Sequence, residues 1–152
     1  MQNLPIKITK VTNDKARELA RLQHRLWQNV AYQDLVVNIQ ENLMLHDRAF
    51  FIALQGDNAV GYSEFGLRYD SVTGATTSPV AYLEGIFVLE MFRRQHIGYK
   101  LVEAGFKWAS TQNISEIGSD VTLDNISSQK FHEYLGFREA GRLIHYIREV
   151  DS

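Results

Sequence analysis

The hydrophobic pattern of the first half of the chain predicts a strand, two helices and a β-hairpin. Residues 6–9 alternate between apolar and polar, which is typical of a strand. Apolar residues then recur at helical spacing in a segment capped by residues 12–14 that runs to about residue 27, and again over residues 35–45. Residues 49–55 and 59–69 predict the two strands of the hairpin. The helix positions expected to face the core are Leu19, Leu22, Leu26, Trp27, Leu35, Ile39, Leu43 and Met44.

The second half predicts three more strands and two helices. Residues 80–88 form a nearly continuous apolar run, as expected of a strand covered on both faces. A helix is predicted from residue 97, with an apolar stripe of Ile97, Leu101, Ala104, Gly105, Trp108 and Ala109. The remaining predictions are a strand over residues 116–121, a helix over 126–135 that stops at Gly136, and final strands over 138–142 and 144–149. This order predicts a mixed α/β fold in which residues 1–152 form a single domain.

Composition narrows the classes of function. The chain has 152 residues, of which 45% are hydrophobic and 22% charged, as in globular proteins. Its net charge of -2 argues against a nucleic-acid binder. There is no cysteine, and no long apolar run indicates a membrane span or a signal peptide, so a cytoplasmic location is the default expectation. His24, His46 and His145 lack metal-ligand spacing, and we predict no metal.

A basic turn joins the strand over residues 80–88 to the helix that follows it. The run from Arg93 to Gly98, RRQHIG, sets two guanidinium groups beside the N–H groups of a helix start. Such a combination favours a phosphate or pyrophosphate. The alternative is a basic helix start that is simply solvated.

Two further positions carry candidate chemistry. Glu84 interrupts an apolar strand, and a buried carboxylate is costly unless it is paired or hydrated, so we expect it to face a cleft. The alternative is a salt bridge to an arginine. Asp124 and Asn125 follow the predicted strand over residues 116–121 and suit either helix capping or a site. Asp47, Asp57, Glu103 and Glu116 are interpreted as solvated acids.

The basic turn resembles motif A of the Gcn5-related N-acetyltransferases (GNAT), Arg/Gln-x-x-Gly-x-Gly/Ala, with His96 in place of the first glycine. Histidine tolerates left-handed backbone angles better than most residues. The resemblance implies a GNAT fold, with a central, largely antiparallel sheet whose central strands splay. It also implies that the turn wraps the pyrophosphate of acetyl-CoA and that the strand backbone binds the pantetheine. The cofactor-binding residues so implied are Ile86, Phe87, Val88, Arg93, Arg94, Gln95, His96, Ile97, Gly98 and Tyr99.

The segment from Asn125 to Phe137 resembles motif B of the same family, Asn-x-x-Ser/Ala-x-x-Phe/Leu-Tyr-x-x-x-Gly-Phe. By that resemblance Asn125 contacts the pantetheine or phosphate region of CoA. His132 takes the position that often carries a tyrosine general acid, and a histidine there can protonate the departing thiolate. A packed helix histidine is the alternative reading.

Four segments sharpen the resemblance to the aminoglycoside 6′-N-acetyltransferases. They are residues 26–27, 77–80, 83–89 and 119–125. The resemblance implies that Glu84 and Asp120, on adjacent strands, bind the amino groups of the drug. Trp27 lines the same pocket unless it only packs in the core. Glu139 lies near Gly141, where some relatives carry an acid, and Ser71 stands where a tyrosine is common.

The hypothesis from the sequence is therefore acetyl transfer to the 6′-amino group of an aminoglycoside by direct attack of the amine on the thioester. Glu84 or Asp120 would accept the proton, directly or through water. A homodimer is implied, since relatives pair through their C-terminal strands. The alternatives are an enzyme for another small amine, a polyamine or a protein N-terminus, and a CoA-binding module without catalysis.

Overall fold

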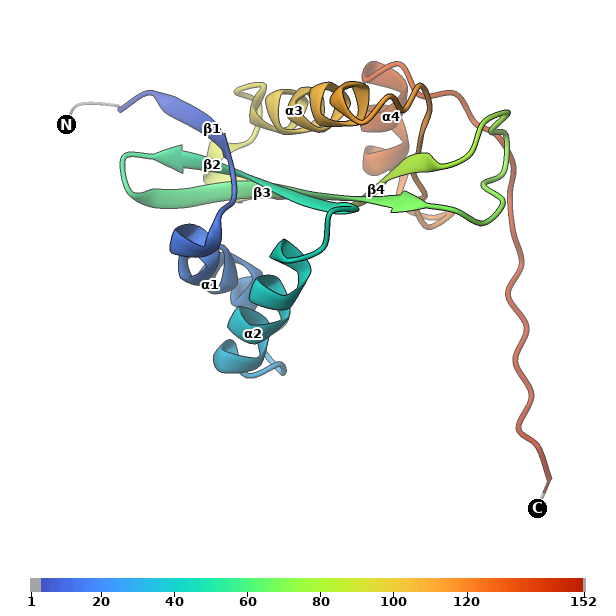
Figure 1. The fold of residues 1–152 in the computed structure, drawn as a ribbon, viewed down its shortest axis with the longest axis horizontal. Coiled ribbons are helices and arrows are strands. Elements are labelled where there is room, and N and C mark those ends of the chain that lie inside the picture. The colour runs from blue at the N-terminus through green and yellow to red at the C-terminus, as the bar shows by residue number, and fades with distance from the viewer. Residues whose placement is uncertain (1–3, 152) are drawn as a thin grey trace.

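The computed structural model describes residues 4–151, and it arranges five strands in one sheet with helices on both faces (Figure 1). The strands lie in sequence order, and their bounds are β1 (Ile6–Lys10), β2 (Arg48–Gln55), β3 (Asn58–Arg68), β4 (Val80–Val88) and β5 (Ile117–Gly118). The first three pairings are antiparallel and the last, between β4 and β5, is parallel. The predicted mixed fold class is confirmed.

Two hydrophobic cores lie on opposite faces of the sheet. Helices α1 (Ala16–Leu26) and α2 (Tyr32–Leu43) cover one face, and α3 (Ile97–Thr111) and α4 (Ile126–Tyr134) lie over the other (Figure 1). Short 3-10 turns, Asn13–Lys15 and Glu90–Phe92, precede α1 and α3. Strand β2 contributes to both cores because neighbouring side chains point to opposite faces. One face receives Phe50, Ile52 and Leu54, and the other receives Ala49, Phe51 and Ala53.

Helix α3 is fixed closely against the sheet. Its apolar stripe is buried as predicted, with Ala104 only partly covered. A Cβ atom at Gly105 would overlap the ring of Phe65 on β3, so the glycine sets how near the helix can approach. Ser63 of β3 adds a buried hydrogen bond to the Leu101 carbonyl, 3.1 Å long. The start of α3 is therefore held at a defined place beside β4.

The ends of α1 and α2 correct three predicted core positions. Leu26 and Trp27 are exposed, although Leu19 and Leu22 are buried. Met44 is 86% exposed, because it follows the last residue of α2. Helix α2 also begins at Tyr32, within the predicted break over residues 28–34. At Leu26, Trp27 and Met44 the helical period continues in the sequence to positions that the core does not cover.

The predicted strands near the C-terminus are the largest error. Residues 138–142 and 144–149 form no strand, and the predicted strand over 116–121 is reduced to Ile117–Gly118. The segment after α4 instead passes the loop at Thr73 and Gly74, which Gly141 and Ala140 approach, and then runs away from the body as an extended tail (Figure 1). A strand needs a neighbour to take up its backbone hydrogen bonds. The short β5 provides none for this segment in a single chain.

Strand β4 has one edge that is largely open. Its pairing with β5 covers only Ala81 and Tyr82, so between residues 83 and 88 that edge has no neighbouring strand within the described part of the chain. This divergence of β4 and β5 is the splay that the family resemblance implied. No helix within residues 4–151 is both long and apolar enough to span a membrane.

Candidate active site

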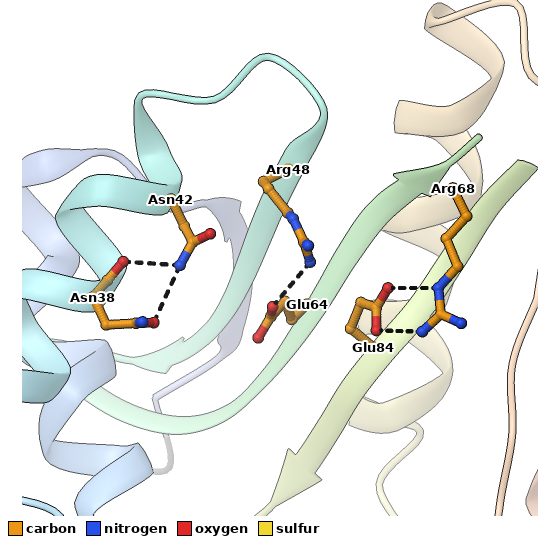
Figure 2. A network of polar contacts seen from close by, with 6 residues as sticks. All are labelled: Asn38, Asn42, Arg48, Glu64, Arg68 and Glu84. Atoms are coloured by element: carbon orange, nitrogen blue, oxygen red, sulfur yellow. Dashed lines mark hydrogen bonds and ion pairs between the residues drawn. The ribbon is translucent and has the colours of Figure 1, made fainter. Parts of the chain in front are cut away.

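A row of charged side chains crosses β2, β3 and β4 on the face that carries α1 and α2 (Figure 2). Glu64 of β3 and Glu84 of β4 stand next to each other in this row, each with its own arginine. Arg48 Nη1 lies 3.7 Å from Glu64 Oε2. Arg68 makes a two-pronged contact with Glu84, donating from Nε at 3.1 Å and from Nη2 at 2.9 Å. The salt-bridge alternative for Glu84 is therefore the one that the structure shows.

Arg68 also connects Glu84 to the second predicted acid. Its guanidinium carbon lies 3.3 Å from the centre of the Tyr82 ring, within cation–π range. The Tyr82 hydroxyl donates to Asp120 Oδ2 at 2.5 Å. Glu84 and Asp120 are thus joined through two intervening side chains, and the structure brings together the pair that the resemblance implied.

The electrostatics of this cluster follow from burial and from close charges. Burial, assisted by the hydrogen bond to Asp120, raises the pKa of Tyr82 to about 12, so its phenol remains a donor at neutral pH. Hydrogen bonding to Glu84 is the largest cause of a raised pKa at Arg68, and the charge of Asp120 adds to it. Burial raises the pKa of Glu64, and Arg48 opposes this shift. On this face the acids Glu64, Glu84 and Asp120 outnumber the cations Arg48 and Arg68, so its formal charge is negative.

The basic turn has the geometry of an anion site. Arg94 and His96 both adopt positive φ angles, 66° and 62°, so the left-handed conformation expected of His96 is present. His96 is the N-cap of α3. The first N–H groups of α3, those of Ile97, Gly98 and Tyr99, have no acceptor one turn earlier in their own helix.

Other contacts fix the turn against its neighbours. Arg93 Nε donates to the Val88 carbonyl at 3.0 Å, which ties the turn to the end of β4. A Cβ atom at Gly98 would lie 3.1 Å from the ring of Phe131, so glycine lets α3 start close to α4. The helix start thus lies beside the open edge of β4 formed by Ile86, Phe87 and Val88. These residues fit a ligand that has a phosphate end and an amide-containing arm.

The two candidate residues of helix α4, Asn125 and His132, both make hydrogen bonds within the protein. Asn125 Oδ1 accepts from the Ser128 N–H at 3.1 Å, so Asn125, and not Asp124, caps the helix. Both ring nitrogens of His132 are engaged, Nδ1 with the Ser128 carbonyl at 2.7 Å and Nε2 with Ser119 Oγ at 2.7 Å. Since a carbonyl only accepts, Nδ1 carries a proton and Nε2 of a neutral ring accepts from Ser119. The contacts leave the role of His132 as a general acid a prediction.

Trp27 and Glu139 make no polar contact with Glu84 or Asp120 in the described part of the chain. Trp27 is 42% exposed, so the core-packing alternative is wrong for it. Glu139 is exposed and forms an ion pair with Arg142 Nε at 2.5 Å. No hydrogen bond or ion pair within residues 4–151 joins either side chain to Glu84 or Asp120. Their substrate-binding roles also stay predictions.

Sequence reasoning missed Arg68, Glu64 and Tyr82, and it misjudged Glu116. Arg68 and Glu64 have a signal, because both lie at alternate positions of β3 on the same face as Tyr62. Glu116 was interpreted as solvated, and this is wrong. Its Oε1 accepts from the N–H groups of Thr76 and Thr77 at 2.9 and 2.7 Å, and from both threonine hydroxyls. Its position in the sequence carries no signal of these contacts.

Comparison with known proteins identifies the class. Residues 13–137 match the acetyltransferase (GNAT) family, and the chain belongs to this family. The predicted fold and family are confirmed, and with them an enzyme class that uses acetyl-CoA. No group of three His, Asp or Glu side chains in the described part of the chain is arranged to hold a metal ion.

Among its relatives, the aminoglycoside N(6′)-acetyltransferase type 1 of Serratia marcescens is 38% identical over 130 residues, which are 85% of this chain and 89% of that protein. A solved structure of the aminoglycoside N-acetyltransferase AAC(6′)-Iy in complex with CoA matches with a TM-score of 0.91 at 31% identity, over 98% of both chains. AAC(6′)-Iy with the bisubstrate analogue CoA-S-monomethyl-acetylneamine matches with a TM-score of 0.89 at 32% identity, over 96% of this chain and 99% of that one.

Proposed function

We propose that this chain is an acetyl-CoA-dependent aminoglycoside 6′-N-acetyltransferase, with residues 1–152 as one catalytic domain. The observation that carries the proposal is the position of the acids. Glu84 and Asp120 share one cluster on the face of the sheet, and Glu84 lies in the part of β4 that has no pairing with β5. The names of the relatives support the same substrate class, and the Serratia marcescens protein is matched over 89% of its length.

The acetyl-CoA site is assigned to the start of α3 and the edge of β4. Arg94, Gln95 and His96, with the N–H groups of residues 97–99, would hold the pyrophosphate at the positive end of the helix. Backbone groups of Ile86, Phe87 and Val88 would bind the pantetheine arm, and Asn125 lies at the start of the neighbouring helix. Arg93 is bonded to the Val88 carbonyl and so serves to shape the turn. When bound, acetyl-CoA supplies the activated acetyl group.

The aminoglycoside site is assigned to Glu84 and Asp120, with Trp27 and Glu139 at its margins. Aminoglycosides carry several ammonium groups, and paired carboxylates on a partly covered face attract them more strongly than isolated surface acids do. The amine attacks only when it is neutral. Glu84 or Asp120, directly or through a water, accepts the proton that leaves the ammonium group.

The transfer itself then needs little from the protein beyond position and polarity. The neutral nitrogen forms a bond to the thioester carbonyl carbon, and the carbon–sulfur bond breaks. A backbone N–H near Phe87 or Val88 stabilises the oxygen as it becomes negative. The nitrogen is positively charged after the attack and gives up its second proton, and the departing thiolate takes up one proton, delivered by His132 or by water, so that a neutral amide and a thiol result. The products are the N-acetylated drug and CoA.

The first test is an acetyl-transfer assay with kanamycin or tobramycin, in which thiol release is measured and the product is identified by mass and position. The expected product is a single acetyl group on the 6′-nitrogen. Glu84→Gln should lower kcat/KM for the drug roughly 100-fold or more, because an amide neither pairs with an ammonium group nor accepts its proton. CoA affinity should be unchanged.

The control is Glu41→Gln, which removes an exposed acid from α2 and should leave the kinetics as they are. Acetylation of polyamines or peptides in preference to the drugs would replace aminoglycosides as the substrate. CoA binding without transfer to any amine would instead indicate a non-catalytic module. Full activity of Glu84→Gln would remove Glu84 from the site.

We also propose a homodimer formed through the C-terminal tail. The tail exposes a run of large apolar side chains, Leu143, Ile144, Tyr146, Ile147 and Val150, and Ile147 is 100% exposed. An open groove of about 330 Å³ lies between α3, β5 and the end of α4, lined by residues that include Phe106, Ile114 and Phe137. A second copy that places its tail beside β5 would cover both surfaces. A cytoplasmic location is proposed with it, because acetyl-CoA is a cytoplasmic metabolite.

A further inference from the structure

We propose that Arg68 is a positioning residue that holds Glu84 and Asp120 in one fixed arrangement for the ammonium groups of the substrate. The proposal rests on the proposed function, since it assigns the same two acids to substrate binding. It adds a residue that neither the sequence motifs nor the family comparison marked. The Arg68 side chain contacts both Glu84 and the ring of Tyr82, and Tyr82 in turn bonds Asp120.

The contact with Glu84 fixes the orientation of a carboxylate. Two parallel hydrogen bonds, 3.1 and 2.9 Å long, join the planar guanidinium to both oxygens of Glu84. A bidentate pair of this kind defines the plane of the carboxylate as well as its position. One lone pair on each oxygen is left available for a further cation. Glu84 is therefore held in place without being fully occupied.

The contact with Tyr82 extends this control to Asp120. The guanidinium carbon lies over the Tyr82 ring, 3.3 Å from the ring centre. The ring in turn carries the hydroxyl that donates to Asp120. Asp120 follows the two-residue β5, where little regular structure holds the backbone. The bond from Tyr82 is thus the main side-chain restraint on this acid in the described part of the chain.

An ordinary surface ion pair would look different. Exposed pairs are weak and variable in geometry, and they seldom engage a third group. The neighbouring Arg48–Glu64 pair is covered to a similar degree but has looser geometry, with one contact of 3.7 Å and no hydrogen bond between the two side chains. The Arg68 side chain is 43% exposed, but Glu84 is only 20% exposed and lies on a strand whose opposite face is packed against α3. The two arginines of Figure 2 therefore have different relations to their acids.

Charge balance explains why a positive residue suits a site for positive groups. Glu84 and Asp120 carry like charges and so repel each other, and a cation that lies between them opposes this repulsion. Arg68 removes most of that repulsion and leaves a net charge of about −1 for the three groups, by simple addition of their formal charges. An arriving ammonium group meets two ionised, ordered acceptors.

The test compares Arg68→Lys and Arg68→Gln with the parent enzyme in steady-state assays with kanamycin. Lysine keeps the charge but loses the two-pronged geometry and the planar stacking, so it is not a conservative change here. Both variants should lower kcat/KM for the drug about 10-fold to 100-fold, because misplacing a binding group by about 1 Å has effects of that size. The dissociation constant for CoA and the melting temperature should stay at the parent values.

Two further variants make the result specific. Arg21→Lys, at the exposed ion pair of Arg21 with Glu18 on α1, is the control and should leave the kinetics unchanged. Tyr82→Phe removes the hydroxyl that bonds Asp120 but keeps the ring under Arg68, and it should also reduce kcat/KM. Because Arg68 and Tyr82 act through one array, the double variant Arg68→Lys with Tyr82→Phe should lose less than the product of the two single losses.

The outcomes separate this proposal from the proposed function. Full activity in Arg68→Lys, while Glu84→Gln is inactive, would overturn the positioning role and leave the substrate site intact. Full activity in Glu84→Gln would overturn the site itself. A fall in melting temperature and in CoA affinity that accompanies the kinetic loss would identify Arg68 as a residue of the fold instead.

Discussion

At the scale of single residues, the acids of this chain differ in what holds them. Glu84 is held by a guanidinium, Asp120 by a phenol, and Glu116 by a pair of backbone amides with their threonine hydroxyls. The first two partners leave an acid able to meet a further cation. The third surrounds the carboxylate with donors from one loop, so Glu116 acts on the conformation of residues 70–79 and not on a ligand.

Glu116 should therefore stabilise the protein in a pH-dependent way. Hydrogen bonding from the Thr77 hydroxyl, and then from the Thr76 N–H, holds the pKa of this carboxyl below its ordinary value of 4.5. A lowered folded-state pKa gives stability that is present above 4.5 and is lost as the pH falls through the lower, folded-state value. Glu116→Gln should lower the melting temperature at pH 7, with a difference that shrinks below pH 4.5.

Thermal unfolding of both proteins across that range measures this difference. Glu133→Gln, which removes an exposed acid of α4, is the control and should follow the parent at each pH. A difference between Glu116→Gln and the parent that is the same at pH 3.5 and pH 7 would show that the carboxylate charge has no part in holding the loop.

At this scale the sequence predicts the acids better than their partners. Glu84 is conspicuous because an acid in an apolar strand must be paired or hydrated, and Asp120 came only from the family resemblance. Arg68 was not found, because its position in β3 indicates the face of the sheet on which it lies but not its partner, which is 16 residues further on. The same applies to Glu116, whose partners lie 39 and 40 residues earlier.

At the scale of elements, the geometry of α3 decides where the proposed cofactor site lies. The helix start carries the anion-binding groups, and its middle is packed against β3 at Gly105. Any change that lifts the helix from the sheet would move its N-terminus away from the edge of β4. Packing in the core and binding at the turn are therefore linked through one rigid element.

Gly105→Ala tests this link. The added Cβ overlaps the ring of Phe65, so the helix or the ring must shift. Overpacking of this kind costs about 1–3 kcal/mol, which corresponds to roughly 3–10 °C in melting temperature for a chain of this size. CoA affinity, measured by calorimetry, should fall in parallel because the helix start is displaced.

Two companion variants define the cause. Ser110→Ala changes an exposed position of the same helix and should leave stability and CoA affinity near the parent values. Phe65→Leu in the Gly105→Ala background makes room for the new methyl group and should recover part of both losses. If Gly105→Ala is as stable as the parent, the close approach of α3 to β3 is not what glycine serves at this position.

Helices and strands were predicted correctly where a long hydrophobic pattern in the sequence is buried in the structure. The buried stripe of α3 and the strands β2 to β4 followed from such patterns. The prediction of buried residues was wrong at helix ends, as at Met44, because the hydrophobic period of a helix does not show where the sheet that covers it stops. The strand over 116–121 failed for a related reason, since its pattern is that of a strand but only two residues reach the neighbouring β4.

At the scale of the whole molecule, the tail is the feature that a single chain leaves unexplained. Its large apolar residues fall on both faces of an extended chain, yet they are exposed beyond α4 (Figure 1). Burying a large apolar side chain is worth about 1.5–3 kcal/mol. Several such residues in each of two copies offer enough to offset the cost of association. The strand predicted over residues 144–149 would then form by pairing with a second copy of the chain.

Tyr146→Asp combined with Ile147→Asp should convert a dimer into a monomer, because the charges cannot be buried without partners. Light scattering coupled to size-exclusion chromatography, with the protein at tens of micromolar, measures the mass directly. The matched control, Tyr146→Phe with Ile147→Val, keeps the apolar surface and should stay dimeric. Since both side chains are at least 90% exposed in the single chain, the monomer should retain its circular dichroism spectrum and its melting curve should lose only the concentration dependence. A parent protein that is monomeric at this concentration would mean that the tail does not pair with a second copy.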